Sequence, residues 1–394
     1  MSNVPVGYKQ TDVGVIPEDW ETDLVKNHCL ITTGAKNTQD RIEDGQFPFF
    51  VRSQKIEKIN SYSFDGEAVL TAGDGVGTGK VFHYIKGKFD LHQRVYKMSD
   101  FSEKLDGYFF YLYFSNHFYN RIMQMTAKSS VDSVRMEMIA DMKIPLPPTL
   151  TEQTAIATAL SDVDALLNQL DKLIAKKRDI KQATMQQLLT GKKRLAGFSG
   201  EWEVKKLGEV ASLSRLNIIP ANWPTQMYVH FSLPAFDEGK SPVVELGSEI
   251  KSNKFIVPEG TVLVSKLNPR IPRVWMPDEI PENSIASTEF LVLFPKNGIS
   301  RQFLFILCKS PKFCEQMEKS ATGTTGSHQR ISPSDALTMS IFVPSDSEEQ
   351  TAIATLLTDM DNEISQLQQR RHKTHALKQG MMQQLLTGKI RLVS

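Results

Sequence analysis

Two long stretches of the chain carry apolar residues at alternating steps of four and three, the pattern of a helix that buries one face. We predict two such helices, each with a seam of about three heptads. Because both seams have the same phase and length, we expect the helices to pack on each other. The alternative, that each packs only on its own domain, stays open, and so does their relative direction. The seam residues are Ile156, Leu160, Val163, Leu167, Leu170 and Ile174, then Ile353, Leu357, Met360, Ile364 and Leu367.

The two helical stretches are copies of each other. Residues 147–195 align with 344–392 without a gap, and about half of the aligned positions are identical. The eight residues MQQLLTGK occur at 185–192 and again at 382–389, so the copies lie 197 positions apart. About 40 residues at about 1.5 Å each predict a rod of about 60 Å.

Residues that favour helix ends mark the limits of each copy. Pro147 and Pro344 precede the helices, and Gly191 and Gly388 stand where a left-handed C-terminal residue is favoured. Two pairs have the capping-box spacing at the N-termini, Thr149 with Glu152 and Ser347 with Gln350.

A weaker repeat precedes two dissimilar regions. Trp20 in PEDWETDLVK aligns with Trp202 in SGEWEVKKLGEV. The chain therefore has two similar halves with divergent heads, a plan that suggests a pseudo-twofold molecule. We divide it into an N-terminal segment with the first head, the first long helix, the second head and the second long helix, at 1–146, 147–195, 196–343 and 344–394.

Each head is predicted to mix strands and helix. Short β-branched and apolar runs bounded by Gly and Pro predict the strands, GEAVLTAG, KVFHYI and RVYKM in the first head and MYVHFSL, GTVLVSKL and STEFLVLF in the second. One helical stretch follows in each head, at 105–125 and at 300–319. The fold class is therefore α+β.

Composition narrows the class of protein. The chain has 394 residues, of which 40% are hydrophobic and 23% charged, as in ordinary globular proteins of two or three domains. We find neither a run of about 18 apolar residues nor a signal-peptide layout, so we expect a cytoplasmic protein. Cys29, Cys308 and Cys314 lack metal-ligand spacing, and we interpret them as free thiols.

The sequence matches no catalytic motif in full. GDGVGTGK at 73–80 resembles a phosphate-binding loop, but Asp74 stands where Gly is needed and Val81 where Ser or Thr is needed. No cofactor fingerprint, nuclease motif, GxSxG or paired metal-ligand spacing supports a catalytic site in this sequence. We therefore expect neither a cofactor nor a metal in this chain.

Several loops instead carry donors suited to DNA. Arg and Lys donate to guanine edges, Asn pairs with adenine, and hydroxyls and backbone amides bind phosphates. Ordinary solvated basic loops are the alternative interpretation, and the net charge of +1 does not indicate a general DNA binder. The candidate DNA-binding residues are Lys80, Gln93, Arg94, Lys128, Ser129, Ser130 and Arg135 in the first head, and Lys266, Asn268, Arg270, Arg273, Thr324, Thr325, Ser327, His328, Gln329 and Arg330 in the second.

The repeated motifs resemble the specificity subunit of type I restriction-modification systems. The resemblance rests on IPLPPTLTEQTAIATALSD at 144–162, on QQLLTGKKRLAGFSGEWEVKKLGEV at 186–210 and on their second copies, and it covers the whole chain in order. It implies a non-catalytic protein with two target-recognition domains, each contacting one half of an interrupted double-stranded DNA sequence. The two long conserved helices would form an antiparallel coiled coil that acts as a spacer.

The resemblance also implies partners. Two methyltransferase subunits would bind the assembly and modify adenine with S-adenosylmethionine, and restriction subunits that use ATP and Mg would cut unmethylated DNA. The near-neutral charge then indicates that the partners supply much of the phosphate contact. A coiled-coil scaffold that reads no bases is the competing function, and a stand-alone enzyme is a third.

The spacer hypothesis can be tested by changing the helix length. Inserting a few residues into both helices, near Leu167 and near Ile364, should change the unread gap between the two halves of the DNA target. Adenine methylation mapping of cells that carry the variant measures the gap. An unchanged gap would contradict the spacer hypothesis.

Overall fold

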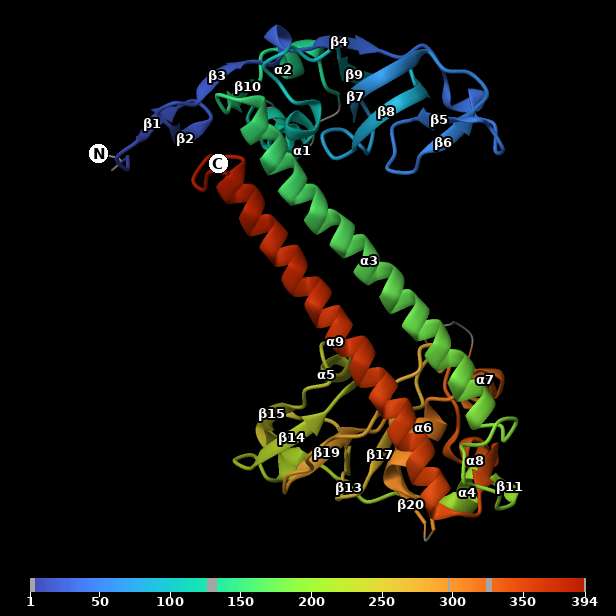
Figure 1. The fold of residues 1–394 in the computed structure, drawn as a ribbon. Helices are drawn as coiled ribbons and strands as arrows, with labels where there is room; N and C mark the ends of the chain where they lie inside the picture. The colour runs from blue at the N-terminus through green and yellow to red at the C-terminus, as the bar shows by residue number, and fades with distance from the viewer. Residues whose placement is uncertain (1–3, 126–132, 297, 324–327, 393–394) are drawn as a thin grey trace. The chain divides into compact units, whose positions relative to one another are not determined.

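The chain folds into two compact units that share its two longest helices. The computed structural model describes residues 4–125, 133–296, 298–323 and 328–392. Unit 1 comprises Met1–Asp171 and Arg370–Ser394, and unit 2 comprises Lys172–Gln369. Each long helix has 39 residues and contributes one part to each unit: α3 spans Leu150–Leu188 and α9 spans Ser347–Leu385 (Figure 1). The units cut across the four segments defined by the repeat, whose boundaries stay a prediction.

Unit 1 contains a six-stranded sheet with the order β4-β9-β7-β8-β5-β6, in which only β5 and β8 pair in parallel. Helix α1 covers the sheet, and Phe114 lies edge-on to Phe82 with 5.6 Å between ring centres. The elements are β1 Tyr8–Thr11, β2 Gly14–Pro17, β3 Glu21–Leu24, β4 Leu30–Thr33, β5 Phe47–Phe50, β6 Glu57–Ile59, β7 Phe64–Ala72, β8 Phe82–Leu91, β9 Val95–Ser99, α1 Gly107–Met125, α2 Met136–Ala140 and β10 Lys143–Leu146.

Unit 2 contains a four-stranded sheet, β12-β20-β17-β18, and a five-stranded sheet, β13-β16-β19-β14-β15. Its elements are β11 Trp202–Lys206, α4 Leu207–Val210, β12 Ala211–Ser214, β13 Asn217–Ile218, β14 Met227–Phe231, α5 Leu233–Asp237, β15 Val243–Leu246, β16 Lys254–Ile256, β17 Val262–Ser265, β18 Val274–Trp275, β19 Ser284–Ser287, β20 Phe290–Pro295, α6 Arg301–Cys308, α7 Pro311–Lys319, α8 Pro333–Leu337 and β21 Ser340–Pro344.

The two heads share a strand plan despite their dissimilar sequences. The order β4-β9-β7-β8 in unit 1 matches β12-β20-β17-β18 in unit 2, and β8-β5-β6 matches β19-β14-β15. The pairing directions also agree, because β14 and β19 pair in parallel as β5 and β8 do. The long β8 of the first head thus corresponds to two short strands in the second.

The predicted strands of both heads are confirmed, whereas the single helix expected at 300–319 is wrong. The chain forms α6, turns, and starts α7 at Pro311. The Ser310 hydroxyl accepts the Phe313 N–H at 3.2 Å, so Ser310 and Pro311 form a new helix start that the apolar pattern conceals.

Within each unit, α3 and α9 run antiparallel. In unit 1, Asp164 pairs with Lys378 at 2.7 Å and Asp171 with Arg371 at 2.6 Å, so one residue number rises as the other falls. In unit 2, Lys177 pairs with Glu363 at 2.6 Å, and Lys181 with Asp361. Val163, Met360 and Leu367 are half-buried, and the other predicted seam residues, Ile156, Leu160, Leu167, Leu170, Ile174, Ile353, Leu357 and Ile364, are buried.

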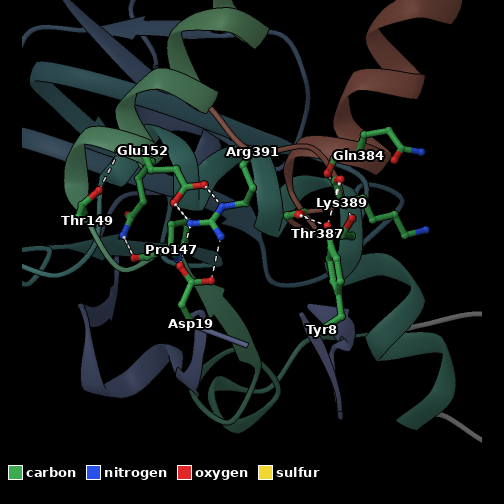
Figure 2. A network of polar contacts seen from close by, with 11 residues as sticks. Tyr8, Asp19, Pro147, Thr149, Glu152, Gln384, Thr387, Lys389 and Arg391 are labelled. Atoms are coloured by element: carbon green, nitrogen blue, oxygen red, sulfur yellow. Dashed lines mark hydrogen bonds and ion pairs between the residues drawn. The ribbon is translucent and has the colours of Figure 1, made fainter. Parts of the chain in front are cut away.

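A buried carboxylate joins the start of one long helix to the end of the other. Figure 2 shows Arg391, after α9, between Glu152 of α3 and Asp19. The Arg391 Nη2 lies 2.8 Å from the Glu152 carboxylate, of which only 1% of the side-chain surface is exposed. In unit 2, Arg194 binds the fully buried Glu349 in the same way, at 2.6 Å. The residues of each pair are 197 positions from those of the other.

The glutamine beside each buried glutamate ties the helix start to its own head. Gln153 accepts the Asp106 N–H at 2.8 Å and donates to the Lys104 carbonyl at 2.9 Å. Gln350 accepts the Ser300 N–H at 3.3 Å and donates to the Gly298 carbonyl at 2.8 Å. The repeated Glu-Gln therefore fixes each helix start against the loop before α1 or α6.

These bonds replace the capping boxes expected from the sequence. The Thr149 hydroxyl does accept the Glu152 N–H at 3.2 Å, but the Glu152 side chain binds arginine instead of returning to the helix start. At α9, Ser347 is already helical, and the Asp346 carboxylate accepts the Glu348 N–H at 2.8 Å. The pairing of Ser347 with Gln350 as a capping box is therefore wrong.

The glycine of each LLTGK motif lies against a tryptophan. Gly388 has a φ of +69°, and a Cβ atom there would lie 2.5 Å from Pro17 and 3.1 Å from Trp20. Gly191 has a φ of +67°, and a Cβ would lie 3.3 Å from Trp202. Both glycines turn the chain so that the following arginine reaches the buried glutamate.

We predict that Arg391→Ala lowers the free energy of unfolding of unit 1 by about 2–3 kcal/mol, because Glu152 would stay buried without its cation and water would offset part of that cost. Urea unfolding measures the loss. Arg371→Ala is the matched control, since that arginine pairs with the exposed Asp171 and its removal should change little. Equal effects of the two substitutions would contradict the prediction.

Candidate nucleic-acid interface

Three loops of the first head meet beyond the ends of β7 and β9. The Gly73 N–H, just after β7, donates to the Arg94 carbonyl at 2.7 Å. The Val134 N–H, just before α2, donates to the Gly73 carbonyl at 2.7 Å, and Asp74 forms an isolated bridge with Ser133. The loop after β7, the turn before β9 and the segment before α2 therefore form one surface, which we call the head 1 loop site.

One carboxylate lies between two arginines in the head 1 loop site. The Asp74 Oδ1 accepts from the Arg52 Nη1 at 2.7 Å, and Oδ2 lies 3.6 Å from the Arg94 Nε. The Arg94 side chain is 65% exposed, whereas that of Asp74 is 25% exposed. These three groups together carry one positive charge, and the Arg94 guanidinium is turned largely to solvent.

His92 lies close to these two arginines and binds the backbone of Arg94. Burial lowers the pKa of the imidazole, and the nearby positive charges of Arg52 and Arg94 lower it further, against the opposing effects of Asp74 and Asp40. The Arg94 N–H donates to the His92 Nδ1 at 2.9 Å, a bond that requires that nitrogen to be unprotonated. The neutral imidazole thus fixes the backbone that presents Arg94.

The other predicted residues of the first head lie nearby or elsewhere on the same loops. The exposed Gln93 donates to Asn37 at 2.6 Å, and Arg135 is the exposed N-cap residue of α2. Lys80 lies at the far end of its loop, with its Nζ 5.4 Å from the Tyr119 ring centre on α1. Lys128, Ser129 and Ser130 lie outside the described residues.

The equivalent loops of the second head also meet. The Lys266 N–H, after β17, donates to the Glu289 carbonyl at 2.7 Å, just before β20. The Asn268 N–H donates to the Gln329 carbonyl at 2.8 Å, and Leu267 forms an isolated bridge with Arg330. We call this surface the head 2 loop site.

A carboxylate again lies beside two cations. Glu289 accepts from the Arg330 Nε at 3.1 Å and from its Nη2 at 3.0 Å, and this pairing raises the pKa of the guanidinium. Burial lowers the pKa of the Lys266 ammonium, while the charge of Glu289 opposes that change and the charge of Arg330 adds to it. Arg330 keeps 48% of its side-chain surface exposed.

The remaining predicted residues of the second head differ in their surroundings. Asn268 has a φ of +48°, and its Oδ1 is buried without a hydrogen-bond partner among the described residues. Arg270 is exposed on the same loop. Arg273, in contrast, binds Asp237 through two bonds at 2.7 and 2.9 Å and has only 14% of its side chain exposed. Its guanidinium is therefore engaged within the fold.

Three predicted residues of this head, Thr324, Thr325 and Ser327, lie outside the described residues. The neighbouring Gln329 is half-buried and contributes its carbonyl to the contact with Asn268. The His328 carbonyl accepts from the Arg330 Nη1 at 3.4 Å.

The fold thus brings together charged and polar residues from distant segments, each of which is only a weak indication of DNA binding in the sequence. Arg52, Asp74 and Glu289 were missed, because single charged residues at strand ends have no diagnostic spacing. A planar guanidinium held by a carboxylate presents its remaining N–H donors in a fixed direction, which suits base edges and phosphates. Both loop sites therefore have the chemistry of a nucleic-acid interface.

Among the described residues, no group of three or more His, Cys, Asp and Glu side chains is placed to hold a metal ion. None of the helices in the described part of the chain is long and apolar enough to cross a membrane.

Comparison with known proteins gives one consistent result. The model of the type I restriction modification DNA specificity domain matches twice, at residues 17–182 and 199–374. The EcoDI specificity subunit of Escherichia coli is 24% identical over 71% of this chain and 70% of its own length. The MjaVIII specificity subunit of Methanocaldococcus jannaschii is 25% identical over 96% of this chain and 94% of its own length.

Solved structures show the same fold. The S subunit of a type I system from M. genitalium has a TM-score of 0.64 at 15% identity, over 96% of this chain and 97% of that one. A chain from a structure on complex assembly and conformational transition of the type I R-M system has a TM-score of 0.54 at 15% identity, over 95% of this chain and 99% of that one. The chain belongs to the family of type I restriction-modification DNA specificity subunits, which confirms the resemblance inferred from the repeated motifs.

We predict that His92 titrates below its ordinary pKa of about 6.5. The unfolded chain then takes up the proton first, so the stability that neutral His92 contributes is present above pH 6.5 and is lost as the pH falls. Urea unfolding between pH 7.5 and 5.5 measures this loss. His92→Asn keeps a hydrogen-bond acceptor but does not titrate, and it should lose less stability than the wild type over this range. An equal loss would refute the assignment.

Proposed function

We propose that this specificity subunit reads a two-part, interrupted DNA sequence, with one head on each half. The observation that carries the proposal is that each head holds a carboxylate close to two cations at its loop site, although the two heads draw these groups from different loops: Asp74 with Arg52 and Arg94 in one, and Glu289 with Lys266 and Arg330 in the other. Because the two heads have dissimilar sequences, they would recognise different base sequences. The chain itself would carry out no catalytic step.

The finer architecture that we propose is a pseudo-twofold repeat in which α3 and α9 form an antiparallel coiled coil. Two kinds of contact support it. The pair Asp164 with Lys378 in unit 1 has its copy in Asp361 with Lys181 in unit 2, as Glu152 with Arg391 has in Glu349 with Arg194. The helix ends also share cores in each unit: Ile156, Leu160, Met382 and Leu385 in one, and Ile353, Leu357, Met185 and Leu188 in the other.

The repeat has a consequence for partners. Two copies of one frame offer two equivalent surfaces, so we propose that two methyltransferase subunits bind this chain and that restriction subunits join them. S-adenosylmethionine, ATP and Mg would be bound by those partners, and this chain would bind double-stranded DNA. The family membership and the repeated frame support this division of roles.

The first test is adenine methylation mapping with the gene intact and deleted. We expect an interrupted two-part motif to lose its methylation on deletion. The double variant Arg270→Ala with Arg330→Ala should then relax or abolish the half of the motif read by the second head, while the complex with the methyltransferase subunits still assembles. A complex that assembles and methylates the unchanged motif would favour a scaffold that reads no bases.

A further inference from the structure

Several N–H donors of the Arg330 guanidinium already form hydrogen bonds within the fold. A guanidinium has five N–H groups. The Glu289 carboxylate accepts hydrogen bonds from Nε and from Nη2 of the guanidinium, and the His328 carbonyl accepts one from Nη1 at 3.4 Å. Among the described residues, these bonds leave one N–H on each terminal nitrogen. A pair of donors on the two terminal nitrogens is the set that the O6 and N7 acceptors of guanine require in the major groove.

The fold also holds Arg330 in place. Its backbone N–H donates to the Thr322 carbonyl at 2.9 Å, and its carbonyl accepts the Thr322 N–H at 2.9 Å. The backbone of Glu289, the residue before β20, is bonded to Lys266 at 2.7 Å. Because both the backbone and the side chain of Arg330 are fixed before DNA arrives, little side-chain freedom is lost on binding.

The charges around this pair explain why the carboxylate does not repel DNA. Glu289 is 27% exposed, binds Arg330 and is close enough to Lys266 for their charges to interact, so the three groups together keep one positive charge. The arginine side chain is 48% exposed and is therefore more accessible than the carboxylate that holds it. Glu289 thus fixes the direction in which the guanidinium presents its remaining donors.

We propose that Arg330 reads a guanine in the half-site of the second head and that Glu289 is the positioning residue that aims it. This rests on the proposed function and deepens it by naming a base and the two residues that select it. A phosphate contact by Arg330 is the competing role, because a guanidinium also binds phosphate oxygens through two bonds.

The experiment uses the full chain in complex with its methyltransferase subunits and measures adenine methylation of genomic DNA. The wild type should require a guanine in the half-site that Arg330→Ala relaxes. Glu289→Gln keeps the size of the side chain but weakens its hold on the guanidinium, and it should lower discrimination at that one position roughly tenfold. The other half-site and the gap should stay unchanged. Arg330→Lys, which keeps the charge without the paired donors, should have the same effect.

Glu315→Gln is the matched control. Glu315 forms an exposed ion pair with Lys319 within α7 of the same unit, and its substitution should leave the motif unchanged. This control separates the loss of one surface ion pair from the loss of the pair that aims Arg330.

Several outcomes would overturn the inference. A half-site without guanine would refute the assigned base. A uniform loss of methylation across all sequences in Glu289→Gln and Arg330→Lys, with unchanged base preference, would assign Arg330 to a phosphate. An unchanged motif in Glu289→Gln would remove the positioning role. If deletion of the gene left all methylation in place, the proposed function itself would fail, which is a separate result.

Discussion

The architecture depends on the buried ion pair that joins the start of one long helix to an arginine six residues beyond the end of the other. A carboxylate with almost no exposed surface is costly unless a cation and hydrogen bonds compensate it. Glu152 obtains its cation from Arg391, and Glu349 from Arg194. Neither partner comes from the same copy of the repeat. Each unit is therefore complete only when it holds the beginning of one helix and the end of the other.

This constraint explains why the chain contains the sequence LLTGK twice. The helix must stop, turn through a glycine with positive φ, pass against a tryptophan and deliver an arginine to the buried glutamate. In unit 2 the tryptophan follows in the same chain segment, as Trp202. In unit 1 it comes from near the N-terminus, as Trp20, and Asp19 adds a second carboxylate to Arg391. In unit 2 one continuous segment forms this junction. In unit 1 the C-terminal and N-terminal segments form the same junction together.

Periodic and local features were predictable, whereas features made by distant residues were not. The seams, the helix ends at Gly191 and Gly388 and the main strands follow from spacing and from glycine chemistry. The capping boxes failed because Glu152 and Gln350 have the right spacing but find stronger partners elsewhere in the fold. Ser310 and Pro311 divided a helix whose apolar run looked continuous. Asp74 and Glu289 pair with arginines only because the fold brings their loops together. No local sequence pattern indicates such long-range pairs.

The near-neutral charge of the chain is consistent with DNA reading once the carboxylates are counted as part of the proposed reading surface. A bare cluster of basic residues would bind any phosphate backbone, and its affinity would carry no sequence information. A carboxylate beside each arginine lowers that general attraction and fixes the guanidinium against a rigid support. The same group that weakens binding to arbitrary DNA therefore sharpens the direction of the donors. For a subunit whose role is discrimination, and whose proposed partners would share the phosphate contacts, that exchange would favour specificity over affinity.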